Sequence, residues 1–445
     1  MAKRSTVVAA SVAALAVVVA GIGVVVAVAG GQSTQKQTVT VRLWDDQVQK
    51  AYDESFAAFE KKNPDIDVKT TLVPWADYFT KLRTDIAGGD ADDVFWVNAG
   101  NFEDYASNGD LVDVTDALGA SAAKNWQSNV VDQYTQGGKL WGVPQLADPG
   151  IGVFYNKELL AKAGVDPAEL DTAHWSPDPA EDTLLPILQK LTLDSAGRNA
   201  ADPAFDPDHV VQYGYNAAND LNAIYINYLG SNGAALQKGD QFVFDSPAGV
   251  RAFQYVVDLI DRYHVAPAAA DTNTNGDFSR DQFTQGKLAL FQTGSYNLAN
   301  VQQGAAFRWG ISTIPAGPDG AISVTNGVIA AGNAHSKHPA AVKKVLSWLG
   351  SEEGSAAIGA GGSASPAVVP AQQSFLDYWK SKGIDVSPLY AVLKNGSVQA
   401  PQGAKWAAAQ SAFGPTFEGI FDGSIPVGDG LRKAQHDANA AIGAG

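Results

Sequence analysis

The stretch of residues 139–160 constrains the fold more than any other part of the chain. It holds a short apolar run that ends near Pro144, a polar break at residues 148–150, and a second run rich in β-branched and aromatic residues. Two strands joined by a Pro-Gly break, without the two-residue spacing of a tight hairpin, favour a segment that crosses between two lobes. We therefore expect a hinge near residues 147–151.

Length and composition limit the class of protein. At 445 residues, with 45% hydrophobic and 18% charged residues, the chain predicts a soluble globular protein of two or three domains. The net charge of −16 would repel nucleic acid, so no nucleic-acid partner is expected. The absence of cysteine from the sequence excludes disulfides, thiolate metal sites and a cysteine nucleophile.

The first residues form an export segment. Lys3 and Arg4 precede an uncharged run rich in Val and Ala that lasts until Lys36, and residues 27–29 form a small-residue cleavage pattern. The apolar run exceeds the roughly 7 to 15 residues of a usual signal core and reaches the roughly 20 that span a bilayer. A cleaved signal peptide and an uncleaved membrane anchor therefore stay alternatives for residues 1–37. Either one places the rest outside the cell, at its surface or associated with its membrane.

Strand and helix patterns alternate after this segment, and the order strand, helix, strand, helix predicts a parallel sheet. Trp44 and Asp45 stand at the carboxyl end of the first strand, where open α/β sheets place ligand sites. Trp75 and Asn98 follow the next two strands in the same way. The sequence thus predicts an α/β fold with candidate ligand groups at one edge of a sheet.

Several separated stretches, in the family's order, resemble the extracellular solute-binding proteins of bacterial ATP-driven import systems, in the branch that carries sugars and oligosaccharides. The likeness covers nearly the whole chain after residue 37. The stretches are DDVFWVNAG (92–100), GVP (142–144), GVFYNK (152–157), GKLALFQTGSYNLA (286–299) and GGSASPAVVP (361–370).

This resemblance implies a two-lobe fold of the periplasmic-binding-protein type II, with each lobe an α/β sheet flanked by helices and a ligand cleft between the lobes. The expected hinge crossings lie near residues 147–151, 291–295 and 340–350. The expected boundaries are 38–148 and 293–345 for the amino-terminal lobe, and 149–292 and 346–445 for the carboxyl-terminal lobe. Rotation about such a hinge leaves each lobe rigid.

The expected ligand-binding residues combine aromatic rings, which cover the CH face of a sugar, with polar groups for its hydroxyls. They are Trp44, Asp45, Trp75, Asn98, Asp148, Tyr155, Asn222, Tyr225, Tyr296, Asn326 and Gly327. Packing roles compete with binding for several of them. Asp45 fits a helix N-cap, Tyr225 fits a core ring, and Trp44 fits a buried ring.

No enzyme motif is recognised. The chain lacks a P-loop, a dinucleotide fingerprint and a nucleophile elbow. His335 and His338 share a loop without further zinc ligands nearby. Residues 271–282 have the oxygen spacing of a calcium loop, but Gln282 stands where a bidentate Glu is required, which favours a plain polar loop. We expect no catalytic residue, no metal and no cofactor.

The sequence therefore predicts a binding protein rather than an enzyme. We expect a monomer that captures a sugar or oligosaccharide and delivers it to the permease subunits of an ABC transporter. Three alternatives stay open, one of them a surface adhesin or sensor component. The same fold could carry a non-sugar solute such as a peptide or polyamine, and a glycoside hydrolase also combines acidic residues with aromatic rings.

Overall fold

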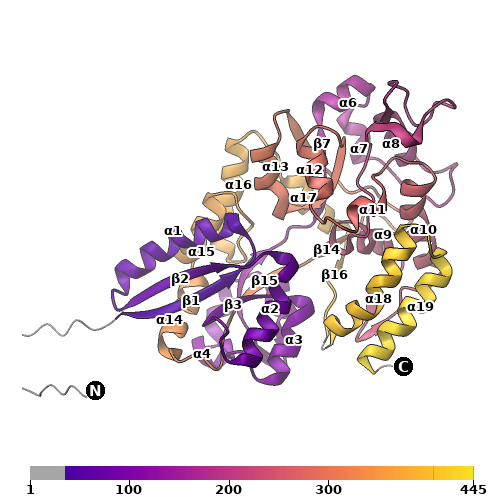
Figure 1. Cartoon of the computed structure of the whole chain (residues 1–445). Helices are drawn as coiled ribbons and strands as arrows, with labels where there is room; N and C mark the ends of the chain where they lie inside the picture. The colour runs from indigo at the N-terminus through magenta and orange to yellow at the C-terminus, as the bar shows by residue number, and fades with distance from the viewer. Residues whose placement is uncertain (1–35, 404, 444–445) are drawn as a thin grey trace, which may run out of the picture. The chain divides into compact units, whose positions relative to one another are not determined.

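The structure, a computed structural model, describes residues 36–403 and 405–443 (Figure 1). The predicted export segment lies outside these residues except for its last two positions. Among the helices of the described part, none has the length and hydropathy that a membrane span requires. Residues 36–445 group into one unit by their contacts, and two separate sheets organise it.

The first lobe is built on a five-stranded sheet in the order β2-β1-β3-β15-β6. β1 pairs in parallel with β2 and β3, whereas β15 runs antiparallel to β3 and β6. The carboxyl ends of β1, β2, β3 and β6 therefore meet the start of β15 at one edge, called here the facing edge. The strands are β1 (Gln37–Leu43), β2 (Ile66–Leu72), β3 (Val94–Asn98), β6 (Val143–Ala147) and β15 (Gly327–Gly332).

Helices cover both faces of this sheet, and α1 shows why. Its residues Val48, Tyr52, Phe56 and Phe59 recur at helical spacing and are all buried. The other elements of the lobe are α2 (Trp75–Gly88), α3 (Ala99–Asn108), α4 (Val114–Leu118), the 3₁₀ helix η1 (Ala120–Asn125), α5 (Ser128–Gln133), β4 (Thr135–Gln136), β5 (Lys139–Leu140), α14 (Pro339–Leu349) and α15 (Glu352–Ala360), with α1 at Asp46–Lys62.

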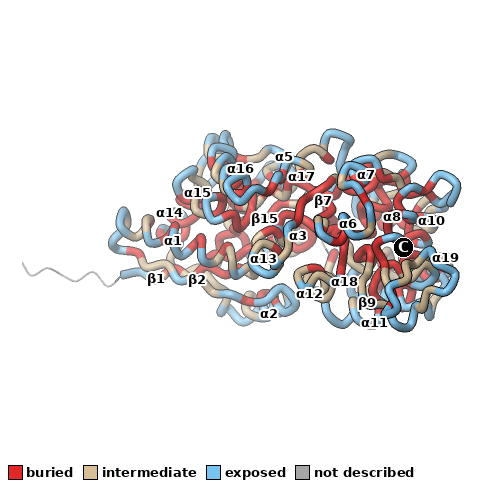
Figure 2. Tube along the Cα trace, turned by 90° about the horizontal axis from the view of Figure 1, so that it is seen from above, coloured by how far each residue is buried: buried red, intermediate tan, exposed pale blue. Residues whose placement is uncertain are grey.

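The second lobe has an antiparallel sheet in the order β12-β7-β13. A two-stranded parallel ladder, β14 with β16, lies beside it. Figure 2 shows β7 and β15 as buried segments, while α2 lies exposed at the surface. The strands are β7 (Ile151–Asn156), β8 (Leu193–Asp194), β9 (Val210–Gln212), β10 (Gln237–Lys238), β11 (Gln241–Phe242), β12 (Leu290–Gly294), β13 (Trp309–Thr313), β14 (Ser323–Thr325) and β16 (Ser397–Gln399).

Most helices of the second lobe are short, and its carboxyl-terminal pair α18 and α19 packs on α10. α16 contacts both lobes. It packs on α15 of the first lobe, and its Trp379 ring lies against Trp309 of β13 in the second lobe. The helices are α6 (Lys157–Ala163), α7 (Pro167–Asp171), α8 (Leu184–Leu191), η2 (Pro207–His209), the π-helix η3 (Leu221–Tyr225), α9 (Ile226–Ser231), α10 (Pro247–Asp261), α11 (Ala269–Thr272), α12 (Phe278–Thr284), η4 (Ser295–Asn297), α13 (Leu298–Gly304), η5 (Val369–Ala371), α16 (Gln372–Ser381), α17 (Ser387–Ala391), η6 (Val392–Asn395), α18 (Trp406–Phe421) and α19 (Val427–Ile442).

The chain passes between the two sheets at residues 148–150, since β6 ends in the first sheet and β7 begins in the second. The other two connections differ from the expected ones. β13 pairs with β7, which keeps the chain in the second lobe until Asn326, between β14 and β15. The third connection follows α15, because that helix packs on α1 of the first lobe.

The boundaries expected at 293 and 346 therefore shift to about residues 326 and 361. The glycine at 294 ends β12, but it does not start a crossing. The chain continues through η4 and α13 to β13, which pairs with β7 in the same sheet. At 340–350 the amphipathic α14 simply covers the first sheet.

The three connections lie side by side. The backbone N–H of Asp148 donates to the carbonyl of Asn326 at 3.0 Å. The N–H of Ala147 donates to the carbonyl of Ser365 at 3.1 Å. All three links between the lobes thus meet at one place, at the β6 and β15 side of the facing edge.

Candidate functional site

A group of aromatic rings stands at the facing edge. Trp44 follows β1, and Trp75 begins α2 after β2; we call these two rings the ring platform. Their centroids lie 5.3 Å apart with the rings edge to face, a favourable aromatic geometry. Trp75 is 52% exposed, which is unusual for so large an apolar side chain beside a sheet. The platform therefore offers an open aromatic surface at a strand end.

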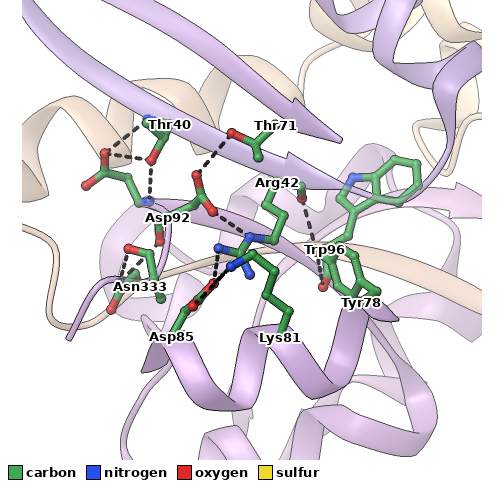
Figure 3. A network of polar contacts seen from close by, with 11 residues as sticks. Thr40, Arg42, Thr71, Tyr78, Lys81, Asp85, Asp92, Trp96 and Asn333 are labelled. Carbon is green, nitrogen blue, oxygen red and sulfur yellow. Dashed lines mark hydrogen bonds and ion pairs between the residues drawn. The ribbon is translucent and has the colours of Figure 1, made fainter. Parts of the chain in front are cut away.

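Buried polar bonds hold the platform from behind. The Tyr78 ring lies 4.9 Å from Trp44, and its hydroxyl donates to the carbonyls of Arg42 at 3.2 Å and Trp96 at 3.0 Å. Arg42, only 4% exposed, pairs with Asp85 at 2.6 Å and Asp92 at 2.5 Å (Figure 3). This network fastens α2 to β1 and β3, so the rings have a fixed support.

Asp45 caps α1. One of its carboxylate oxygens accepts from the backbone N–H groups of Gln47 at 2.8 Å and Val48 at 3.0 Å. Burial raises the pKa of this carboxyl. Asp45 is therefore the N-cap residue of α1, which was one of its two predicted roles. Its role as a ligand-binding residue stays a prediction.

Asn98 lies at the end of β3, half-buried at the facing edge, and its Oδ1 accepts from Asn101 Nδ2 at 2.8 Å. Two residues further on, a Cβ on Gly100 would stand 2.5 Å from the Trp406 ring. Glycine is needed there because α18 of the second lobe approaches the backbone of α3 closely.

The facing edge meets the second lobe directly. Gln303 Nε2 of α13 donates to Gln47 Oε1 of α1 at 3.0 Å. The backbone N–H of Lys405 donates to Asp104 Oδ1 of α3 at 2.8 Å. Since these contacts flank Trp44 on one side and Asn98 on the other, the edge between them faces the second lobe.

Asp148 lies at the first connection, surrounded by phenols. Ser295 Oγ donates to its Oδ1 at 3.2 Å, and burial raises the pKa of the carboxyl to about 6. Burial, with the charge of Asp148 as a further cause, raises the pKa of Tyr134, Tyr296 and Tyr390. These residues come from both lobes, so Asp148 is a meeting point between them.

Tyr296 extends this group into the second lobe. Its ring is 37% exposed, yet burial of the hydroxyl and the nearby charge of Asp220 raise the pKa of the phenol. Asp220 itself caps η3, accepting from Ala223 N at 2.9 Å, and burial raises the pKa of its carboxyl.

Asp220 was missed by sequence reasoning. The only signal for it is an Asp at the N-cap position before the apolar stripe of residues 221–229, which predicts a cap rather than a ligand group. Asn222, two residues on, is half-buried, and its backbone carbonyl accepts from Asn227 Nδ2 at 2.8 Å.

Asn326 and Gly327 lie at the second connection. Asn326 is half-buried, and its Oδ1 accepts from the N–H of Gly327 at 2.9 Å. The carbonyl of Gly327 accepts from the Tyr134 hydroxyl, and a Cβ on this glycine would stand 2.6 Å from Val130. Close packing therefore explains the glycine, while Asn326 lies beside Asp148.

The structure separates two predicted residues from this group. Tyr225 is 4% exposed, with its ring 5.2 Å from Phe253 and 5.5 Å from Phe417, so it belongs to the core of the second lobe. Tyr155 lies near the end of β7 that is remote from the connection, paired with Leu290 and Gly310. Period-two alternation marks Tyr155 as a strand residue and helical spacing marks Tyr225 as a helix residue, but neither pattern tells whether the side chain reaches a ligand.

Neither a metal site nor the hollow described below coincides with this group in the described part of the chain. Among residues 36–403 and 405–443, no group of three or more His, Cys, Asp or Glu is placed to hold a metal ion. In the loop at 271–282, Arg280 pairs with Asp277 at 2.9 Å and Asp281 at 3.4 Å. A hollow of about 880 Å³ lies among α1, α4 and α14 of the first lobe, and none of the predicted site residues lines it.

Residues 45–356 match the family model described as bacterial extracellular solute-binding protein. The chain belongs to this family. Its members are binding proteins that act outside the cell. The match starts next to Trp44 and ends in α15, so it covers every strand of the first sheet except β1, the whole second sheet and two of the three connections of this solute-binding protein.

Solved structures confirm the expected two-lobe α/β fold. The crystal structure of UspC from Mycobacterium tuberculosis is 52% identical, with a TM-score of 0.74 over 91% of this chain and 100% of that one. A substrate-binding protein of Listeria monocytogenes in complex with cycloalternan is 24% identical, with a TM-score of 0.78 over 92% and 99%. A putative binding protein of Brucella abortus is 23% identical over 333 residues, 73% of this chain and 74% of that protein.

Proposed function

We propose that this solute-binding protein captures a sugar or oligosaccharide outside the cell and delivers it to the permease subunits of an ABC transporter. The observation that carries the proposal is the open ring platform, with Trp75 52% exposed, at an edge that faces polar groups of the second lobe. Aromatic rings next to carboxylates, amides and phenols are the groups that bind a sugar from its CH face and its hydroxyls.

Relatives support a carbohydrate ligand. The maltodextrin-binding protein of Bdellovibrio bacteriovorus, solved with maltotriose, has the same fold, with 18% identity and a TM-score of 0.74 over 91% of this chain and 99% of that one. The arabinooligosaccharide-binding protein of Bacillus subtilis is 24% identical over 226 residues, 49% of this chain and 46% of that protein.

The ligand contacts divide between the lobes. In the first lobe, Trp44 and Trp75 cover the ring face, and Asn98 supplies an amide that both donates and accepts. Asp148 and Asn326 act from the connections. In the second lobe, Tyr296 and Asn222 approach from the opposite side, and Asp220 joins them as a further acceptor.

The side-by-side connections supply the moving part. A ligand that touches both lobes binds best when they are together, so it shifts the population toward that arrangement. The permease would recognise this liganded form, which the protein presents as a monomer at the cell surface or associated with the membrane. Because no bond of the sugar changes, the sugar is released intact.

A thermal melting panel tests the proposal. The sugars are maltotriose, cycloalternan, acarbose, mannotriose, tagatose and arabino-oligosaccharides, with short peptides and polyamines as the opposing set. At least one sugar should raise the Tm in a concentration-dependent way, because a ligand of the folded state stabilises it. Shifts from peptides or polyamines alone would overturn the sugar assignment.

Product analysis after prolonged incubation tests the second part. The sugar that raises the Tm should be recovered unchanged. Turnover would instead support the glycoside hydrolase alternative.

A further inference from the structure

Tyr52 of α1 joins the ring platform to the strand that leaves the first lobe. Its hydroxyl accepts a hydrogen bond from Trp96 Nε1 at 3.0 Å and donates one to Gln145 Oε1 at 2.6 Å. All three residues are 0% exposed. Because none of them reaches solvent, loss of the hydroxyl would leave a donor and an acceptor without partners.

One end of this chain of bonds is the ring platform. The Trp96 ring lies edge to face against Trp44, with centroids 4.9 Å apart and an interplanar angle of 77°. The backbone carbonyl of Trp96 also accepts from the Tyr78 hydroxyl (Figure 3). The Tyr78 ring contacts Trp44 as well, with centroids 4.9 Å apart. The orientation of Trp44 therefore depends on where Trp96 is held.

The other end is the set of connections between the lobes. Gln145 lies on β6, three residues before Asp148, and its Nε2 donates to the carbonyls of Pro144 at 3.0 Å and Val143 at 3.2 Å. Its own backbone carbonyl accepts from Ala367 N at 2.8 Å, within the third connection. Gln145 thus lies where the first connection begins and the third one passes.

We propose that Tyr52 is a positioning residue, whose hydroxyl holds the ring platform at a fixed place relative to the connections between the lobes. With the platform fixed, the second lobe meets the rings in the same geometry each time the lobes come together. Tyr52 does not touch the ligand. It raises affinity because the rings need no ordering when the sugar binds. The inference rests on the proposed ligand role of Trp44.

Ser55, on the same helix, offers a matched control. Its hydroxyl also accepts from a buried indole, Trp348 Nε1 at 2.9 Å, and also donates to an oxygen, the Gly354 carbonyl at 2.7 Å. These two hydrogen bonds fasten α1 to α14 and α15. The Trp348 ring contacts Phe59, which is not among the aromatic rings that contact Trp44. Ser55→Ala therefore removes the same chemistry from α1 without reaching the ring platform.

The first test uses fluorine NMR on the full-length protein labelled with 5-fluorotryptophan. The resonances of Trp44 and Trp348 are assigned by their loss in Trp44→Phe and Trp348→Phe. Tyr52→Phe should shift or broaden the Trp44 resonance and leave that of Trp348 in place, whereas Ser55→Ala should do the reverse. An unchanged Trp44 resonance in folded Tyr52→Phe would overturn the inference.

Folding is checked by circular dichroism and by the Tm. Where Tyr52→Phe does not fold, Gln145→Met serves in its place, since it removes the acceptor of the Tyr52 hydroxyl together with the Nε2 bonds to the carbonyls of Val143, Pro144 and Leu349. The expected result is the same movement of the Trp44 resonance, and its absence overturns the inference equally.

The second test measures affinity by calorimetry, with maltotriose as probe, or with the panel sugar of largest Tm shift where maltotriose gives none. Tyr52→Phe should raise the Kd by about 2- to 30-fold, and Ser55→Ala should leave the Kd unchanged. If Trp44→Ala leaves the Kd unchanged, the proposed site is wrong. If Trp44→Ala weakens binding while Tyr52→Phe behaves like Ser55→Ala, the positioning role alone is wrong.

Discussion

The two lobes contribute to the candidate site in different ways. The first lobe presents indole rings that are braced from behind by the parallel strands β1, β2 and β3 and by buried bonds such as that of Tyr78 to Arg42 and Trp96. The second lobe presents carboxylate and phenol groups, Asp220 and Tyr296, on a π-helix and a 3₁₀ helix of a few residues each. One side is aromatic and rigidly supported, and the other is polar and carried by short helices.

This difference predicts that the two lobes contribute differently to the affinity and the selectivity of sugar binding. An apolar ring face binds any sugar with a suitable CH surface, so in the proposed site we expect the first lobe to set affinity more than selectivity. Hydrogen bonds to particular hydroxyls discriminate strongly, because an unmatched sugar leaves buried polar groups unpaired. We therefore expect changes in the first lobe to weaken all ligands alike, and changes in the second lobe to alter the choice among them.

The largest expected effect comes from the support of the first lobe. Arg42→Met leaves Asp92 without its cationic partner and Asp85 with Lys81 alone, at 3.2 Å, and should lower the free energy of unfolding by about 3 to 5 kcal/mol. Arg262 of α10 in the second lobe, 66% exposed and 3.6 Å from Asp258, is the control. Urea unfolding of Arg262→Met should match the parent protein, and an equal loss in both variants would remove the contrast between the lobes.

The second effect concerns the meeting point at Asp148. The pKa of its carboxyl in the folded state, about 6, lies above the ordinary value of 3.8. The folded state therefore holds the proton more tightly between these pH values, and ionisation costs stability above them. Asp148→Asn should therefore raise the free energy of unfolding above pH 6 by at most about 3 kcal/mol.

The gain should shrink through the window from pH 6 to pH 4 and vanish below it. Urea unfolding at pH 4, 6 and 8 measures this. A gain of the same size at all three values would mean that the charge of Asp148 is not what the substitution removes.

The third effect tests the aromatic side. Trp75→Ala should weaken binding of every sugar that binds the parent protein by about 2 kcal/mol, close to 30-fold, because the exposed ring no longer covers the sugar. Val211→Ala, at a side chain that is 54% exposed on β9, is the control and should leave the Kd unchanged. Titration calorimetry gives both values, and unchanged affinity in Trp75→Ala would refute the ring platform.

The smallest effect tests the polar side. Tyr296→Phe keeps the ring and removes one hydroxyl, so it should weaken binding by about 1 kcal/mol, near fivefold. The loss should differ between sugars, and the panel measured at one temperature shows whether it does. An equal loss of affinity for every sugar of the panel would mean that Tyr296, like Trp44 and Trp75, contributes to affinity and not to selectivity.

The parts of this arrangement that follow strand ends could be predicted from the sequence. Trp44, Trp75 and Asn98 come directly after alternating runs, and the carboxyl ends of parallel strands share one edge. The break at residues 148–150 was recognisable for a similar reason, since two apolar runs flank a Pro and a Gly. In these cases local pattern and position in the fold are tied together.

The remaining parts depend on packing between distant segments. The return of the chain at Asn326 is marked by no proline and by a spacing that also suits a simple turn between β14 and β15. Asp220 looks like a helix cap and is one, and only the approach of Tyr296 gives it a second role. Tyr225 does not lie at the candidate site, because its ring packs against Phe253 and Phe417 in the core of the second lobe.

The place of β15 in the first sheet has a consequence for how the molecule is made. This strand pairs with both β3 and β6, yet it comes almost 180 residues after β6 in the sequence. β7, β12 and β13 are all synthesised in the interval. When the chain is made from its amino end, all strands of the three-stranded sheet are therefore present before β15, so the sheet that starts first is completed later.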